Sequence, residues 1–345
     1  MTALNTIDVG TQGSSGATAM SVGVQPRRQG VPAPATARGI VEVTGLHKTY
    51  GRIAAVQDVS FSVGEGEIFG ILGPNGAGKT TTVECISGLR RHEGGTITVL
   101  GLDPQRDRDA LREVVGVQLQ EGSMRSELKV WELVHLFASF YRNPRDETEL
   151  IDLLGLTPKR NASYRSLSGG QKQRLSVALA LIGNPRIAIL DELTTGLDPQ
   201  ARRDTWELIE QVRDQDVTIL LVTHFMDEAE RLCDRVAIVD KGRVIAMGTP
   251  TGLAQREGGG NHMRFQPSQR FDESVIAGLP GINRVERQGS RVVVSGTGDL
   301  VNRVTQALGA IGVQVDDIQL ESATLEDAFV RLTSRPRVVG RSDQS

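Results

Sequence analysis

The chain has 345 residues, of which 39 are glycine and 4% are aromatic, and its formal net charge is −3. That length corresponds to about two domains of roughly 100–200 residues each, and the balanced charge gives no broad positive field, so we expect no nucleic-acid partner. The glycines follow no three-residue period, which excludes a collagen-like fibre, and Cys85 and Cys233 are too few for a disulfide scaffold.

The first 38 residues are rich in Gly, Ser, Thr, Ala, Gln and Pro and contain few large apolar side chains. Such a segment cannot bury enough apolar surface to offset the entropy lost on ordering, so we predict a disordered tail over residues 1–38. No later run of ~18 apolar residues is present, and we therefore expect no membrane-spanning helix.

Strand and helix patterns alternate over residues 39–257, which we predict to form one domain. After two early strands we expect a strand at 68–72 and a helix at 80–89, and a further helix at 199–213. The runs 187–190 and 217–222 are continuously apolar, which is typical of strands buried on both faces of a parallel sheet. The pattern predicts an α/β domain with a mainly parallel sheet. The two early strands carry Val41, Val43 and Leu46, then Val59, Phe61 and Val63.

A glycine triplet at residues 258–260 marks the boundary of a second, smaller domain. Beyond it the pattern predicts strand, helix, strand, strand, helix, strand and a closing helix at 325–333. The order of the first six predicts a small α+β, ferredoxin-like domain, which we assign to residues 258–335. Residues 336–345 are expected to form a flexible tail.

A glycine-rich loop lies between the predicted strand at 68–72 and the helix that follows it. Its residues fit the pattern G-x-x-x-x-G-K-[ST], in which backbone N–H groups surround a phosphate chain and the helix N-terminus faces the anion. Glycine is needed because the backbone must approach the phosphates closely. We expect Lys79 to reach the β- and γ-phosphates and the Thr80 hydroxyl to bind Mg²⁺. The predicted ATP-binding residues here are Gly73, Pro74, Asn75, Gly76, Ala77, Gly78, Lys79, Thr80 and Thr81.

Two acidic residues, Asp191 and Glu192, end the apolar run at 187–190. The carboxyl end of a parallel strand is where ligands bind in such sheets. A carboxylate at this position can hold Mg²⁺, and its neighbour is placed to polarise an attacking water as a general base. We therefore predict Asp191 as a metal ligand and Glu192 as a catalytic residue.

A second anion site is predicted at residues 168–171, where a serine and two glycines begin a helix. The run Leu167-Ser168-Gly169-Gly170-Gln171-Lys172-Gln173-Arg174 resembles the signature sequence of ATP-binding cassette (ABC) ATPases. With it, residues 187–192 resemble the Walker B strand and catalytic glutamate of that family, and Gly196-Leu197-Asp198-Pro199 its D-loop. Together with the phosphate loop, these motifs extend the resemblance over about residues 40–255.

The resemblance implies roles for four further positions. His224 corresponds to the switch histidine that contacts the γ-phosphate, and Gln120 to the Q-loop glutamine that binds Mg²⁺ and water, although Gln118 is two residues away and spacing alone does not separate them. Tyr50 corresponds to an adenine-stacking residue, and Asp198 lies in the D-loop. Leu193 departs from the family pattern, which has proline there.

The family architecture also implies a helical subdomain at about 121–167 and a second cassette, either another copy or a paralogue. ATP is then held between the phosphate loop of one copy and Ser168, Gly169, Gly170 and Gln171 of the other. A separately encoded permease is implied, with the chain at the cytoplasmic side of the membrane. The apolar residues expected in the groove facing it are Trp131, Leu133, Leu136, Phe137 and Phe140.

The end of the chain, residues 320–333, resembles the small C-terminal domain of multidrug exporter ATPases of the daunorubicin-resistance type. This favours an ATPase subunit of a multidrug or antibiotic exporter. Three alternatives stay open: an importer ATPase whose C-terminal domain is regulatory, a lipid or polysaccharide exporter ATPase, and a soluble ABC ATPase that acts on the ribosome or DNA.

Overall fold

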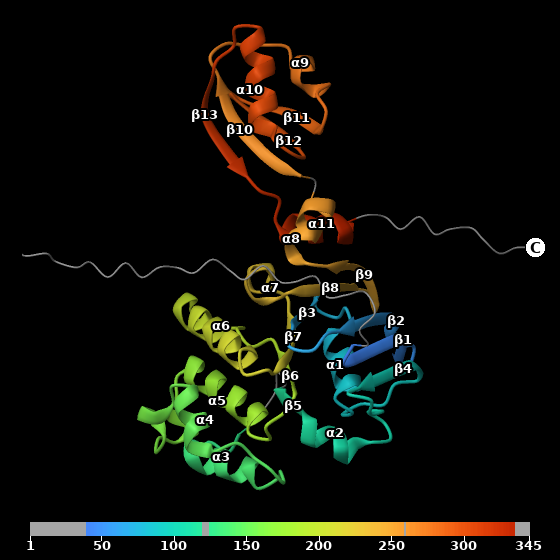
Figure 1. Cartoon of the computed structure of the whole chain (residues 1–345), viewed down its shortest axis with the longest axis vertical. Helices are drawn as coiled ribbons and strands as arrows, with labels where there is room; N and C mark the ends of the chain where they lie inside the picture. The colour runs from blue at the N-terminus through green and yellow to red at the C-terminus, as the bar shows by residue number, and fades with distance from the viewer. Residues whose placement is uncertain (1–38, 119–123, 259, 335–345) are drawn as a thin grey trace, which may run out of the picture. The chain divides into compact units, whose positions relative to one another are not determined.

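The computed structural model describes residues 39–118, 124–258 and 260–334. The tails predicted at 1–38 and 336–345, and the candidate Gln120, lie outside the described residues. Figure 1 shows the elements in chain order. Within the described ranges no helix has the length and apolar character needed to span a bilayer.

Nine strands form one sheet in the order β4-β1-β2-β9-β8-β3-β7-β6-β5. The pairs β8–β3, β3–β7, β7–β6 and β6–β5 are parallel. The pairs β1–β2, β1–β4 and β8–β9 are antiparallel. With the parallel pair β2–β9, five of the eight strand pairs are parallel and three are antiparallel, so the sheet is mixed and, as predicted, mainly parallel. The strands are β1 (Val41–Tyr50), β2 (Ile53–Val63), β3 (Ile68–Leu72), β4 (Gly94–Val99), β5 (Val115–Gln118), β6 (Ile187–Asp191), β7 (Thr218–Thr223), β8 (Arg235–Asp240) and β9 (Arg243–Gly248).

The antiparallel edge follows from the length of its connection. Tyr50 pairs with Ile53, so only two residues join β1 to β2. A parallel partner would need a crossover of a dozen or more residues, and a two-residue turn permits only an antiparallel hairpin. Gly51 occupies the turn with a φ of 61°, a conformation that glycine adopts without steric cost.

The central strands are apolar throughout because each contributes to two cores. In β6 the side chains of Ile187 and Ile189 belong to one buried cluster, and those of Ala188 and Leu190 to the other. Successive side chains of a strand point to opposite faces, so both faces of the sheet are covered. The covering helices are α1 (Lys79–Ile86), α2 (Arg108–Val114), α3 (Val130–Ala138), α4 (Glu147–Leu153), α5 (Gly169–Leu181), α6 (Pro199–Arg213) and α7 (Met226–Leu232).

Helix α1 is shorter than the predicted 80–89. It ends at Ile86, and Gly88 then adopts a φ of 72°. A left-handed glycine just after the last turn is a common way for a helix to stop. The helix predicted at 199–213 coincides with α6, which begins at Pro199 after the N-cap Asp198.

A second, four-stranded sheet lies between residues 261 and 321, in the order β11-β12-β10-β13 with every pair antiparallel. Its own buried cluster includes Met263, Phe265 and Val294 from the strands and Leu300, Val304 and Leu308 from one face of α10. The elements are β10 (Asn261–Pro267), α9 (Ser274–Ala277), β11 (Ile282–Gln288), β12 (Arg291–Gly296), α10 (Leu300–Ala310) and β13 (Val315–Glu321).

The closing helix α11 (Leu325–Ser334) packs against α8 (Pro250–Glu257) and α7. Leu325 is fully buried and belongs to the same cluster as Leu253 of α8. The chain also returns close to where it left, because a Cβ on Gly258 would lie 3.1 Å from Cβ of Ala323. The four-stranded sheet is thus inserted between two helices that contact each other.

This arrangement predicts different outcomes for two shortened chains. Replacing residues 261–321 by a short Gly-Ser linker keeps α11 in place, and we expect ATP binding and thermal stability to be retained. Ending the chain at residue 260 removes Leu325 from the core, and we expect a loss of at least about 2 kcal/mol, the lower end for truncating a buried leucine. Urea unfolding of both forms measures the difference. Equal stability would show that α11 contributes nothing to the larger core.

Candidate functional site

The glycine-rich loop connects β3 to α1, as the sequence predicts. A Cβ on Gly73 would lie 2.2 Å from the Val239 carbonyl oxygen, and one on Gly78 2.3 Å from that of Ala55. Both positions therefore require glycine for packing. Gly76 has a φ of 79° and open space where its Cβ would be, so the loop backbone there is accessible to a ligand.

Lys79, the first residue of α1, bends back over this loop. Its Nζ donates hydrogen bonds to the carbonyl oxygens of Gly73 at 2.8 Å and Pro74 at 3.1 Å. The residue is 5% exposed, and burial lowers the pKa of its ammonium group while Glu192 and Asp191 raise it. The ammonium is therefore held at the loop by two neutral acceptors, and phosphate oxygens would be stronger partners.

Thr80 and Asp191 are brought together although 111 positions separate them. The Thr80 hydroxyl donates to Oδ2 of Asp191 at 3.0 Å. Oδ1 of the fully buried Asp191 has no hydrogen-bond partner among the described residues. Burial, and secondarily Glu192, raises the pKa of this carboxyl to about 6, against the lowering effects of Thr80 and Lys79. A hydroxyl beside an unpartnered buried carboxylate oxygen fits a hard cation such as Mg²⁺.

Gln118, the last residue of β5, contacts Asp191 from the neighbouring strand. Its Oε1 accepts a hydrogen bond from the Asp191 backbone N–H at 3.1 Å, and its side chain is buried. The sequence analysis considered Gln118 only as a rival of Gln120. In the structure it fixes the end of β6, and the parallel pairing of β5 with β6 places it there.

Glu192 and His224 also meet, although they follow different strands. Nδ1 of His224 lies 3.2 Å from Oε1 of Glu192, within hydrogen-bond distance. Glu192 has a φ of 50°, a conformation that is costly for a residue with a side chain. Its backbone N–H donates to the Val222 carbonyl at 2.9 Å, which anchors the turn. A carboxylate held in this way at the strand ends is placed to accept a proton from water.

Leu193, the departure from the family pattern, is fully buried in the core. Its side chain therefore contributes packing directly behind the Glu192 turn, where proline would instead fix φ.

The signature residues form the start of helix α5, which lies far along the sequence from the phosphate loop. Oγ of Ser168 accepts from the Gln171 N–H at 3.3 Å, and the Gln171 side chain accepts from the Ser168 N–H at 3.0 Å, which forms a capping box. Ser168 and Gly169 are exposed, and a Cβ on Gly170 would meet Ala201 just after the D-loop. In the described part of the chain no hydrogen bond joins this helix start to residues 73–80.

Tyr50 ends β1 and is 40% exposed. Nζ of Lys48 lies 5.5 Å and Cζ of Arg90 5.2 Å from the centroid of its ring, within the range of cation–π contact. The ring is thus accessible for stacking, but two cations already contact it.

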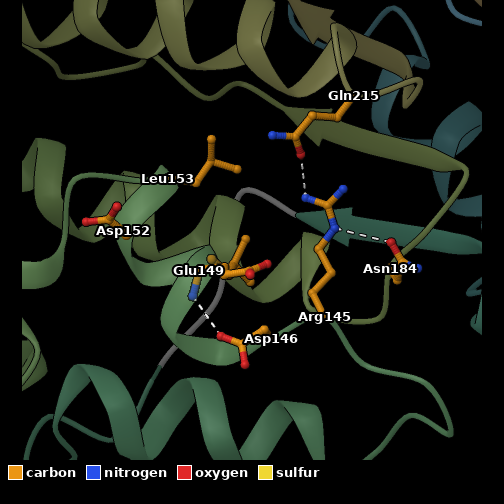
Figure 2. Close-up of a pocket in the computed structure, with 8 residues that line it drawn as sticks. Arg145, Asp146, Glu149, Asp152, Leu153, Asn184 and Gln215 are labelled. Carbon is orange, nitrogen blue, oxygen red and sulfur yellow. Dashed lines mark hydrogen bonds between the residues drawn. The ribbon is translucent and has the colours of Figure 1, made fainter.

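A separate cavity of about 600 Å³, shown in Figure 2, contains none of the predicted nucleotide residues. Arg145 dominates it and donates to Asn184 at 3.2 Å and Gln215 at 2.7 Å, joining the chain before α4 to the loops that follow α5 and α6. These contacts join the chain before α4 to the loops that precede β6 and β7, and we assign the cavity no part in ATP binding.

The raised pKa of Asp191 predicts a pH effect on stability without nucleotide or metal. Because the folded chain holds this proton more tightly than the unfolded chain, the contribution of Asp191 is complete at low pH and is lost as pH rises to about 6. Asp191→Asn should therefore be more stabilising, relative to the parent, at pH 7 than at pH 5, by about 1.3 kcal/mol, since roughly half of the total effect of about 3 kcal/mol is already present at pH 5. Urea unfolding at both pH values tests this. A difference independent of pH would mean that Asp191 ionises normally.

Taken together, a phosphate loop between β3 and α1 and two carboxylates at the end of β6 define a P-loop ATPase. A protein-family model described as ABC transporter matches residues 56–195. The Nod factor export ATP-binding protein I of Mesorhizobium japonicum is 38% identical over 301 residues, covering 86% of this chain and 87% of the relative. The chain therefore belongs to the ATP-binding proteins of ABC transporters and hydrolyses ATP, as the motifs indicate.

Two further comparisons extend this result. The daunorubicin/doxorubicin resistance ATP-binding protein DrrA of Streptomyces peucetius is 33% identical over 308 residues, 86% of this chain and 93% of the relative. Among solved structures, a dimeric post-hydrolysis state of the ATP-binding cassette MJ0796 with ADP and Pi matches with a TM-score of 0.56 and 28% identity. That match covers 61% of this chain and 98% of the other.

Proposed function

We propose that the chain is the ATPase subunit of an exporter of drugs or similar small molecules, working on a separately encoded permease at the cytoplasmic face of the membrane. The observation that supports this is the length of the similarity. The alignments with an export protein and a resistance protein exceed 300 residues and so extend past the larger domain. A lipid or polysaccharide exporter is the alternative to a drug exporter.

Within this function we propose Glu192 as the general base for the attacking water and His224 as its partner at the γ-phosphate. Lys79 and the N–H groups of the phosphate loop would bind the β- and γ-phosphates. Thr80 and Asp191, with Gln120, would hold Mg²⁺, which supplies charge neutralisation at the phosphates when it is bound. The arrangement of Thr80 and the unpartnered oxygen of Asp191 supports that assignment.

We propose that two copies of the chain, or the chain and a paralogue, form the working unit. The signature helix start and the phosphate loop are two exposed anion sites that no hydrogen bond in the described residues connects. A second copy would supply Ser168, Gly169, Gly170 and Gln171 across ATP, with Asp198 nearby and Tyr50 at the adenine. The dimeric MJ0796 structure supports this arrangement.

We propose that α3 and the turn that follows it form the surface that contacts the permease. Phe140 is 61% exposed and Leu136 43% exposed, and the rings of Phe137 and Phe140 contact each other edge to face. Leu133 is buried and belongs to the core, and Trp131 packs against that core. Large exposed apolar side chains grouped in this way mark interaction surfaces.

For the C-terminal part we propose a ferredoxin-like domain at about 261–321. The order strand, helix, strand, strand, helix, strand and the sheet order β11-β12-β10-β13 support it. The sequence analysis placed the domain limits at 39–257 and 258–335. Because α11 packs with the larger domain, we propose to assign α11 to that domain instead of the smaller one.

Export is tested with inside-out membrane vesicles from cells that express the chain together with the permease encoded beside it. We expect ATP-dependent accumulation of a fluorescent drug such as daunorubicin, and none in vesicles that carry Glu192→Gln. Transport of a labelled lipid or glycan, with no accumulation of the drug, would favour the lipid or polysaccharide exporter. Equal accumulation in the parent and Glu192→Gln vesicles would contradict the proposal.

A further inference from the structure

Helix α7 contains a carboxyl group that the proposed hydrolysis does not use. Glu228 is fully buried, and its Oε1 accepts a hydrogen bond from Nε1 of Trp206 in α6 at 3.2 Å. Its Oε2 has no hydrogen-bond partner among the described residues. Burial raises the pKa of Glu228 although the side chains of Thr223, Thr194 and Trp206 lower it. Burying an acid is costly unless it is hydrogen-bonded, and the bond from Trp206 ties this acid to α6.

A second contact joins the same two helices one turn away. Nη1 of Arg202 lies 3.3 Å from Oδ2 of Asp227, and its Cζ lies 4.6 Å from the centroid of the Phe225 ring. The Phe225 ring in turn contacts the His224 ring, with centroids 4.1 Å apart. Arg202 and Trp206 are four residues apart and so lie on one face of α6. We call the group of Arg202, Trp206, Phe225, Asp227 and Glu228 the α6–α7 latch.

The latch lies between two segments that reach the nucleotide site. On one side α6 starts at the D-loop residue Asp198, whose side chain accepts the N–H groups of Gln200 and Ala201. On the other side the start of α7 follows His224, which lies 3.2 Å from Glu192. Closely packed interiors transmit strain, so we expect a displacement of the D-loop segment to be passed through these contacts to the residues next to His224.

We propose that the α6–α7 latch positions His224 for hydrolysis, with Arg202, Trp206 and Glu228 as positioning residues. The proposal rests on the role of His224 proposed above. The latch holds the Phe225 ring between Arg202 and His224, and Glu228 fixes the first turn of α7 against α6. Loss of the latch should therefore impair turnover more than nucleotide binding.

The first test separates turnover from binding in the full-length chain. Trp206→Phe removes the N–H donor but keeps an aromatic ring, and we expect kcat to fall about 2- to 10-fold, the range for one lost hydrogen bond, with the Kd for ATP within twofold. The matched control is Glu210→Gln, which breaks the partly exposed ion pair with Arg231 between the same helices. Its kcat should stay unchanged because ion pairs near the surface contribute little and because this pair contacts neither Phe225 nor His224 in the described residues. An unchanged kcat in Trp206→Phe would overturn the proposal, as would a loss explained by a smaller folded fraction in urea unfolding.

The second test uses Trp206 itself as the probe. The chain has two tryptophans, and Trp131→Phe leaves Trp206 as the single emitter. We expect its emission to change on binding Mg-ATP but not Mg-ADP, and His224→Ala to abolish the change. An equal response to both nucleotides, or no response to ATP, would contradict the latch. Turnover of His224→Ala alone reports on His224, so failure of that assignment is distinguishable from failure of the latch.

Discussion

Replacing Glu192 by glutamine is expected to lower ATP turnover about 10²- to 10⁴-fold, the usual contribution of a general base. The amide keeps the size of the side chain and a hydrogen-bonding oxygen for His224, which lies 3.2 Å from the carboxylate, but it cannot accept a proton from water. Phosphate release under saturating Mg-ATP measures the loss. Because ATP still binds, an ATP-bound dimer should accumulate and elute earlier in size-exclusion chromatography with ATP than without it.

Glu207→Gln is the matched control, since the same chemical change then falls on an exposed position of α6. Its turnover should equal that of the parent chain. If Glu192→Gln hydrolysed ATP at the parent rate, Glu192 could not be the base, and the hydrogen bond to His224 would have only a structural role.

Replacing Lys79 by alanine is expected to weaken ATP binding about 10- to 100-fold, as for the loss of one or two hydrogen bonds to a charged group. Lys79 is almost completely buried, and its ammonium already lies against the loop carbonyls of Gly73 and Pro74. Phosphates arriving at the loop therefore meet a positive charge that is already oriented. Titration with ATP and a fluorescent analogue measures the Kd.

The control for Lys79 is Lys159→Ala, which removes an exposed lysine between α4 and α5. Its affinity for ATP should match the parent. Equal affinity of Lys79→Ala and the parent would contradict the assignment of residues 73–80 as the phosphate site.

Local patterns predicted much of the larger domain because each pattern has a local physical cause. Continuous apolar runs located β6 and β7, and Asp198 followed by Pro199 marked the start of α6. The mainly parallel sheet was predicted, but its antiparallel pairs were not located, because the apolar runs show burial on two faces but not strand direction. The two-residue turn at Gly51 contained that information.

The site was predicted where one chain segment supplies the chemistry, as at Lys79 and Thr80. Contacts between distant segments could not be read from spacing. The sequence gives no sign that Gln118 accepts the Asp191 N–H, or that Trp206 donates to Glu228, because register and helix packing create these contacts. Leu325 likewise showed helical spacing, yet nothing local indicated that its helix packs against α8. Gln120 stays a prediction outside the described residues.

The proximity of Gly258 and Ala323 has a practical consequence. The chain leaves the larger domain and returns to it at nearly the same place. Any segment inserted between these two positions therefore needs ends that lie close together. Folded modules whose own ends lie close together tolerate insertion at such points. A fluorescent protein or a ligand-binding module could therefore replace the four-stranded sheet while α8 and α11 stay in contact. The first would report the state of the ATPase by fluorescence, and the second would place its activity under the control of a ligand.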